Sequence, residues 1–217
     1  EKDREKIHIG SYNNELNNAT WYYNSVLITD NVFTSVVLNG EVTIFKVDKI
    51  ISGGITVPST LGSYPVTSIG DGAFRDCSKL KSVTIGNGVT SIGYRAFSDC
   101  SSLTSITIPN SVTSMGYNAF SDCRSLIGIT IPDGVTNIGG SAFSGCSSLT
   151  SINIPDGVTS ILPSTFYNCS KLKSITIPDS VTSIGMGAFK WCSSLEKISL
   201  PFVGAEYNGT SNTHFGY

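Results

Sequence analysis

One spacing dominates this sequence: phenylalanine and cysteine each recur every 23 residues. The two series are Phe74, Phe97, Phe120, Phe143, Phe166 and Phe189, and Cys77, Cys100, Cys123, Cys146, Cys169 and Cys192. All the cysteines of the chain belong to this series, and neither series slips by a residue. A fixed period of this length is typical of solenoids, in which each unit completes its burial only against its neighbours. The repeat therefore predicts one elongated array with flanking segments.

The order of apolar residues within a unit predicts how each coil is built. The units run over residues 66–88, 89–111, 112–134, 135–157, 158–180 and 181–203. In the first unit, segment 73–80 carries its apolar residues at helical spacing, whereas Val83 and Ile85 alternate with polar residues as in a half-buried strand. The predicted fold is an α/β repeat solenoid, a right-handed leucine-rich-repeat coil. It should have parallel strands on one face and short helical or 3₁₀ turns on the other.

The residues outside the units divide into three segments. Residues 1–19, which begin with a run of mixed charges, are expected to form a frayed N-terminal segment. Residues 20–65 are expected to form a β-rich N-terminal cap, because Asn39-Gly40 between two apolar runs predicts a hairpin. This cap should include a partial repeat, in which Ile55 and Val57 match the strand positions of the units. Residues 204–217 are expected to be a C-terminal tail, truncated from a longer chain.

The fifth unit departs from the others at two small residues. Leu162 stands at a position where the other five units have glycine, and Thr165 stands where they have alanine. The glycines of this column are Gly70, Gly93, Gly116, Gly139 and Gly185. Since glycine readily adopts positive φ, we expect the glycines to have φ above zero and Leu162 to avoid that conformation. The fifth unit is therefore predicted to be irregular.

Charge and hydropathy exclude several partners. The formal net charge is −2 and 14% of the residues are charged, without the clustered Lys and Arg that nucleic-acid binding requires. No apolar run reaches the roughly 18 residues of a membrane span, and no signal peptide is recognisable. A secreted protein whose signal has been removed would look the same. We expect a monomer without a nucleic-acid partner and without a membrane span in this chain.

The cysteines are predicted to be buried and reduced. Equivalent cysteines of adjacent coils should lie about 5 Å apart, which is within reach of a disulfide. However, their Cβ vectors would run parallel, and pairing would break the equivalence of the six units. Disulfides and a metal site remain alternatives, although paired C-x-x-C spacing is absent. We expect no metal and no cofactor.

Nothing in the sequence indicates an enzyme. The two histidines, His8 and His214, lie in opposite flanks, and no G-x-S-x-G, H-E-x-x-H or phosphate-loop motif occurs. Asp133, Asp156 and Asp179 should form a short acidic row at one bend. Each unit supplies one carboxylate there, whereas calcium takes about six to eight oxygens, so solvated turn residues are the better interpretation.

Two kinds of exposed column are candidates for ligand binding. The first kind is hydroxyl ladders: Thr84, Thr107, Thr130, Asn153, Thr176 and Ser199 on the strands, and Thr67, Thr90, Thr113, Thr136, Thr159 and Thr182 elsewhere. Ordered hydroxyls suggest glycan or ice binding, although threonine also suits a half-exposed strand. The second kind is aromatic: Tyr94, Tyr117, Tyr167 and Trp191 occupy exposed repeat positions, most of which hold small residues in other units. Aromatic side chains anchor many interfaces, and packing along the coil is the competing interpretation.

The unit motif I-G-x-x-A-F-x-x-C followed by L-x-x-I-x-I-P closely resembles the BspA-like class of leucine-rich repeats, also described in treponemal surface proteins. The resemblance covers residues 66–203 and, in part, 55–65. The segment Leu200–Tyr217 looks like one that follows such arrays in some gut-bacterial members. The resemblance implies a secreted or surface-attached bacterial protein that adheres to host proteins, other bacteria or glycans. It supplies no catalytic residues.

We therefore expect a non-enzymatic, extracellular recognition or adhesion module that binds a host protein, a bacterial partner or a glycan. One alternative is a structural spacer, whose repeats give reach while another domain binds. The other is a threonine-ladder surface that binds glycan or ice. The sequence alone does not name the ligand.

Overall fold

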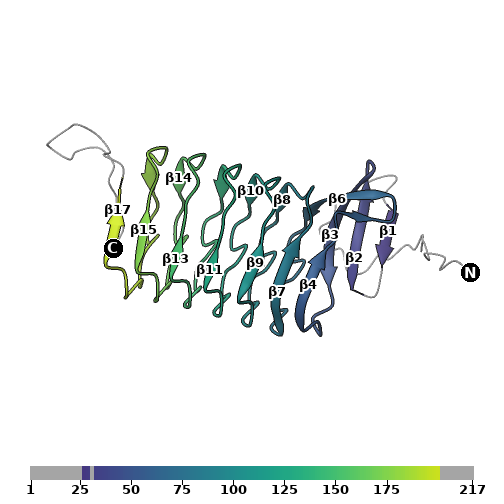
Figure 1. Cartoon of the computed structure of the whole chain (residues 1–217), viewed down its shortest axis with the longest axis horizontal. Coiled ribbons are helices and arrows are strands. Elements are labelled where there is room, and N and C mark those ends of the chain that lie inside the picture. The colour runs from purple at the N-terminus through teal and green to yellow at the C-terminus, as the bar shows by residue number, and fades with distance from the viewer. Residues whose placement is uncertain (1–25, 30–31, 201–217) are drawn as a thin grey trace, which may run out of the picture.

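The computed structural model describes residues 26–29 and 32–200, which form an elongated stack of coils (Figure 1). The coils follow one another from the N-terminal end, purple in Figure 1, to the C-terminal end, yellow. Residues of adjacent coils pair at an offset of 23, as Ser91 does with Ser114. The solenoid prediction is therefore confirmed. The segments expected at 1–19 and 204–217, with both histidines, lie outside the described residues.

One row of parallel strands runs along the stack and is called the strand face below. Its members are β4 (Gly53–Val57), β7 (Leu80–Ile85), β9 (Ser105–Thr107), β11 (Gly128–Ile129), β13 (Ser151–Ile152), β15 (Ser174–Thr176) and β17 (Lys197–Ser199). β4 pairs with β7 so that Ile55 is opposite Val83 and Val57 is opposite Ile85. The row is not one continuous ladder, because it divides into β4-β7-β9, β11-β13 and β15-β17.

A second row of strands runs along another side of the coils. It contains β3 (Glu41–Val47), β6 (Tyr64–Ile69), β8 (Ser91–Ile92), β10 (Ser114–Met115), β12 (Asn137–Ile138), β14 (Ser160–Ile161) and β16 (Ser183–Ile184). Antiparallel β2 (Phe33–Leu38) and β1 (Val26–Thr29) extend its N-terminal end, and β5 (Thr60–Leu61) pairs with β6. β2 and β3 form the predicted hairpin, whose Asn39 and Gly40 have φ of 54° and 82°. Positive φ at both central residues is typical of a type I′ turn.

The core consists of equivalent side chains stacked from coil to coil. The six phenylalanine rings form a column with neighbouring centroids 4.7–5.7 Å apart. Phe74, Phe97, Phe120, Phe143 and Phe166 are fully buried, while Phe189 in the last coil is only partly buried. Each internal ring therefore has a phenylalanine on both of its faces, and the terminal ring has one.

The expectation of helical or 3₁₀ turns, and with it the α of the predicted class, is wrong. In the described residues the segments that lead from the second row to the strand face are successive turns without a helix. Alternate amide groups donate to the next coil. The N–H groups of Gly72 and Phe74 donate to the carbonyls of Tyr94 and Ala96 at 2.8 and 2.7 Å. Only the intervening amides bond within the coil, as Cys77 N–H does to the Phe74 carbonyl. A helix would keep all of its interior donors within itself.

Two positions in each turn segment are left-handed, which also excludes a helix. One position is filled by Gly72, Arg95, Asn118, Ser141, Ser164 and Gly187, and the other by Asp76, Asp99, Asp122, Gly145, Asn168 and Trp191. Their φ angles lie between 52° and 74°. The three-residue spacing of Phe74, Cys77 and Leu80 thus comes from consecutive turns, which share this spacing with a helix.

The glycine column has a different cause from the one expected. None of Gly70, Gly93, Gly116, Gly139 and Gly185 has positive φ. Instead, a Cβ on Gly139 would lie 2.3 Å from the Tyr117 backbone nitrogen and 2.4 Å from the Gly116 carbonyl carbon. Glycine is required here because adjacent coils approach too closely for any side chain.

The fifth coil departs from the others at this same place, although not through the difference in the sign of φ that was expected. β12 and β14 are not paired, although the second row is continuous before and after them. At the preceding junction Thr136 N–H donates to Thr113 and Gly139 N–H to Met115, at 3.0 and 2.9 Å. Within residues 32–200 the amides at the corresponding positions, 159 and 162, make no such bonds to the fourth coil. The Cβ of Leu162 lies where other adjacent coils come closest together. The fourth and fifth coils therefore cannot approach each other as the third and fourth coils do.

The cysteines are free and buried, as predicted. Each thiol from Cys100 onward donates to a phenylalanine carbonyl of the preceding coil, as Cys100 Sγ does to Phe74 at 3.1 Å. Burial raises the pKa of Cys77 to about 12 and holds the pKa of Cys146 well above its ordinary value. Cys77 and Cys146 therefore stay protonated at neutral pH, and the buried cysteines pack as small apolar residues.

Candidate binding surfaces

The four aromatic residues singled out from the sequence all lie on the turn segments. Tyr94, Tyr117 and Trp191 are 44%, 56% and 60% exposed, and Tyr167 is partly buried. Tyr94 and Tyr117 occupy equivalent positions in adjacent coils, two residues after β8 and β10. No ring contact joins these two tyrosines in the described part of the chain. Each is instead held by a neighbour of its own.

The neighbours of the two tyrosines differ. The Arg95 guanidinium lies 5.0 Å from the centroid of the Tyr94 ring, within the range of a cation–π contact. The Tyr117 ring lies against the next coil, because a Cβ added to Gly140 would be 2.9 Å from its Cε1 atom. Gly140 thus makes room for the ring, and Tyr117 still exposes more than half of its surface.

Tyr167 and Trp191 are brought together by the structure. Their ring centroids are 4.8 Å apart with the planes tilted by 44°, and Lys190 Nζ lies 5.6 Å from the Trp191 ring. Tyr167 comes from the fifth coil and Trp191 from the sixth, one position further along the unit. The two rings and the ammonium group form an exposed cluster, called the aromatic cluster below.

Trp191 holds an unfavourable backbone conformation. Its φ is 65°, at a position where other units use Asp, Asn or Gly. Asp, Asn and Gly tolerate left-handed φ, whereas a bulky residue there costs about 1–2 kcal/mol. The sequence analysis singled out Trp191 for its size and missed this strain. The signal was available, since a column of Asp, Asn and Gly indicates a left-handed position.

The two hydroxyl ladders differ in their hydrogen bonding. In the ladder from Thr67 to Thr182, the hydroxyls of Thr90, Thr113 and Thr182 donate to the threonine carbonyl of the preceding coil at 3.1–3.2 Å. This ladder therefore links the coils. On the strand face Thr84, Thr107, Thr130 and Thr176 are exposed, and within residues 32–200 their hydroxyls have no protein partner. Within residues 32–200 Thr136 and Thr159 of the first ladder are also exposed and make no such bond, so both ladders offer hydroxyls to a ligand.

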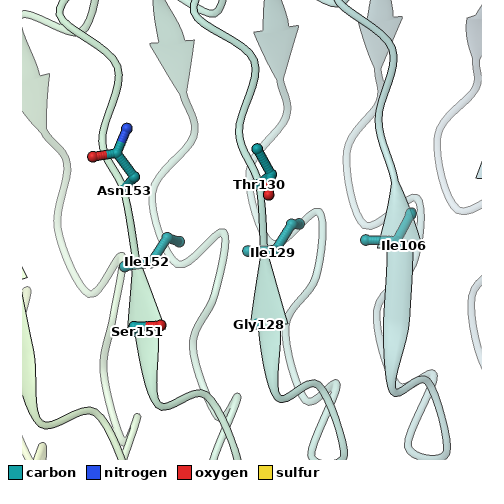
Figure 2. A pocket seen from close by; sticks show the side chains of 7 residues that line it. All are labelled: Ile106, Gly128, Ile129, Thr130, Ser151, Ile152 and Asn153. Atoms are coloured by element: carbon teal, nitrogen blue, oxygen red, sulfur yellow. The ribbon is translucent and has the colours of Figure 1, made fainter.

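The strand face also contains a hollow that the sequence analysis did not predict. Figure 2 shows the residues that line it, from β9, β11, β13 and the residues just after these strands. They are Ile106, Gly128, Ile129, Thr130, Ser151, Ile152 and Asn153, around a volume of about 480 Å³. The signal in the sequence was Gly128, which stands in a column of serines.

In the part of the chain that the structure describes, no group of three or more His, Cys, Asp or Glu could hold a metal ion. Asp133, Asp156 and Asp179 are exposed at one bend, as solvated turn residues would be. The same part of the chain contains no helix that is long and apolar enough to cross a membrane.

Comparison with known proteins relates the array to bacterial repeats. A family model described as "BspA type Leucine rich repeat region" matches residues 54–169 and 114–208, with six copies. A leucine-rich repeat protein of Treponema pallidum is 25% identical, with 76% of this chain and 88% of that chain covered and a TM-score of 0.61. A leucine-rich repeat protein of Bacteroides ovatus is 30% identical, with 80% and 53% covered and a TM-score of 0.61. One from Bacteroides capillosus is 27% identical, with 58% and 96% covered and a TM-score of 0.53.

The chain spans about half the length of the Bacteroides ovatus protein that it matches. No curated protein matches the chain. The family model matches the repeats and the segment directly before them.

Proposed function

The chain belongs to the BspA-type leucine-rich repeat family, and from this membership we propose that it is a non-enzymatic recognition module that works outside the cell. Repeats of this family form protein-binding and adhesion modules, and nothing in the described residues points to catalysis. The ligand is a protein of the host, a protein of another bacterium or a glycan. The protein that carries the array is secreted or attached to the cell surface.

The observation that carries the proposal is the exposed, strained Trp191. Folding alone favours Asp, Asn or Gly at its left-handed position, and a side chain that is 60% exposed gains little from burial. Strain of this kind at an exposed residue is often found at binding sites. Tyr167 and Lys190 hold the ring in place, so that its free surface is ordered before a ligand arrives. Rigid aromatic side chains bury much area at low entropic cost.

Tyr94 and Tyr117 extend the proposed site along the turn segments. Both expose large rings at positions that are Asp, Gly or Pro in three other units. The Arg95 guanidinium lies over the Tyr94 ring, and the Tyr117 ring packs against Gly140. A ligand that spans several coils would contact Tyr94 and Tyr117 in the second and third coils and the aromatic cluster in the fifth and sixth.

The experiment is a binding screen of the full chain against arrays of host proteins, bacterial surface proteins and glycans. The test variant replaces Tyr94, Tyr117, Tyr167 and Trp191 by alanine, and its fold is checked by thermal unfolding. The matched control replaces Thr107 and Thr130 on the strand face by alanine. We expect a ligand that binds the wild type and the threonine variant but does not bind the aromatic variant.

One observation favours a second candidate, the strand-face ladder as a glycan- or ice-binding surface. Within residues 32–200 the hydroxyls of its four threonines are exposed and free of protein partners, whereas three hydroxyls of the other ladder are bonded to the preceding coil. A ligand that still binds the aromatic variant but no longer binds the variant at Thr107 and Thr130 would place the site on this face. A chain that binds nothing in the screen would instead act as a spacer.

A further inference from the structure

Gly128 has no structural reason to be glycine. Every other glycine in the described residues either has positive φ or has an atom within 4 Å of where a Cβ would be. Gly128 has neither, since its φ is ordinary and the space around an added Cβ is open. Four other units carry serine in this column, at Ser82, Ser105, Ser151 and Ser174. The fold would therefore accept serine at 128.

Glycine at this position removes a side chain from the middle of the strand face. A glycine within a strand weakens it, and often marks a place where a ligand or another backbone approaches closely. Here it opens the hollow, whose floor is formed by three isoleucines, one from each of three coils (Figure 2). Ile106, Ile129 and Ile152 remain 7–8% exposed, whereas the equivalent Val83 and Ile175 are 2% and 3% exposed; Ile198, in the last coil, is only partly buried.

A second observation marks the same place. The row of strands on the strand face is interrupted between β9 and β11, beside Gly128, and again between β13 and β15. Ile127, which precedes it, is 57% exposed, at a position that is Lys, Thr or Glu in the other units. Ile127 and Gly128 are thus two adjacent departures from the repeat in the third coil.

The chemistry of the lining selects the occupant. The floor is aliphatic and the rim is polar but uncharged, with hydroxyls from Thr130 and Ser151 and an amide from Asn153. An ion would find no opposite charge in this lining, and a sugar would find no aromatic ring against which to stack. An aliphatic side chain would cover the isoleucines, while the peptide groups on either side of it could bond to the rim.

We propose that this hollow is a binding site for an aliphatic side chain of a protein partner, presented by an extended segment that lies along the strand face. The inference rests on the proposed recognition function and adds a site that is separate from the aromatic residues of the turn segments. Gly128 provides the space, the isoleucines provide the apolar contact, and Asn153 with the two hydroxyls fixes the direction of the bound segment.

The experiment uses amide NMR spectra of the full chain with three small probes. These are N-acetyl-L-leucine methylamide, the corresponding aspartate compound and a methyl glucoside, each titrated to its solubility limit. The test variant is Gly128→Ser, which fills the hollow with the residue of the neighbouring units. The control is Gly134→Ser, a glycine at a bend where Ser111 and Ser180 occupy the equivalent positions.

The leucine probe should shift the amide signals of Gly128, Thr130 and Asn153 in the wild type. Its apparent affinity should fall at least about tenfold in Gly128→Ser and stay unchanged in Gly134→Ser. The aspartate and glucoside probes should leave these signals in place. A leucine probe that shifts none of them, or shifts them equally in Gly128→Ser, would overturn the proposal, as would a stronger response to aspartate or glucoside.

The result separates this inference from the proposed function. If the array screen finds a ligand and the leucine probe does not respond at the hollow, the inference fails and the recognition function stands. If the leucine probe responds and the screen finds no ligand, the hollow stands and the proposed function fails.

Discussion

The substitution Gly139→Ala tests why this solenoid needs glycine at one position of each coil. An added Cβ would lie 2.3 Å from the Tyr117 nitrogen, and 2.4 and 2.6 Å from the carbonyl carbon and oxygen of Gly116. All three atoms belong to the backbone of the third coil, so no side chain can rotate away. Ordinary van der Waals contact begins near 3.4 Å, which means that the coils must separate by about 1 Å.

The magnitude follows from what that separation breaks. The bond from Gly139 N–H to the Met115 carbonyl is 2.9 Å long and would stretch beyond hydrogen-bonding range. A buried amide left without a partner costs about 1–3 kcal/mol, and overpacking of a tight contact costs a similar amount. Against this, alanine reduces the conformational freedom of the unfolded chain, which stabilises the folded state by about 0.4–1 kcal/mol. The net loss should be about 2–4 kcal/mol.

The assay is denaturant unfolding combined with hydrogen exchange at Thr136 and Gly139. The matched control is Gly128→Ala, where the added Cβ meets open space and only the unfolded-state term acts. That control should be stabilised by up to about 1 kcal/mol. If Gly139→Ala proved as stable as the control, or if the exchange of its two amides stayed slow, the close-approach argument would be wrong.

Leu162→Gly should slow hydrogen exchange of the amides at 159 and 162, because the fourth and fifth coils could then approach as the others do; unchanged exchange would contradict this. Phe120→Ala should destabilise the protein by about 3–5 kcal/mol in denaturant unfolding, and Phe189→Ala by less, because Phe120 has a stacked ring on both faces and Phe189 on one; equal losses would refute the stacking argument. The free energy of unfolding should fall between pH 9.0 and about 12, by up to about 1.4 kcal/mol per pH unit from Cys77, because this thiol ionises there in the unfolded chain and not in the folded one. Cys77→Ala should make that decline shallower, and an equal slope in the two proteins would count against it. Trp191→Asn should change stability by less than about 1 kcal/mol, since relief of about 1–2 kcal/mol of strain offsets the lost ring pair and cation–π contact, while ligand binding should drop. A large destabilisation would show that Trp191 is a packing residue.

The period predicted the stack, the strand positions and the core, because each of these follows from apolar residues that repeat in register. Phe74 and its five equivalents could be assigned to one buried column from their spacing alone. The hairpin at Asn39-Gly40 was predictable because its turn requires positive φ at both residues. In these cases one local pattern corresponds to one structure.

The turn segments were mispredicted because two structures share the same spacing. Residues three apart face the same side in a helix and also in a run of successive turns, so Phe74, Cys77 and Leu80 do not distinguish them. The neighbouring coil favours the turns over a helix, because its carbonyl groups accept hydrogen bonds from alternate amides, such as that of Phe74. The glycine column raised a similar ambiguity, since glycine is needed either for positive φ or for the absence of Cβ. The left-handed positions are in fact held by residues such as Arg95 and Ser141, and the glycine column has ordinary φ.

The candidate sites were only partly predictable because they lie where the repeat is broken, and a break can have several causes. Leu162 breaks a contact between coils, Trp191 introduces strain at an exposed position, and Gly128 removes a side chain without any packing need. Sequence alone gives all three the same description, a residue unlike its equivalents. In a solenoid the cost of each break stays with the adjacent coils, since stability is a sum of units and nearest-neighbour interfaces. The phenylalanine column continues past all three breaks with centroids no more than 5.7 Å apart. The core therefore tolerates local departures at the surface, and this tolerance lets a nearly uniform array carry binding residues that differ from coil to coil.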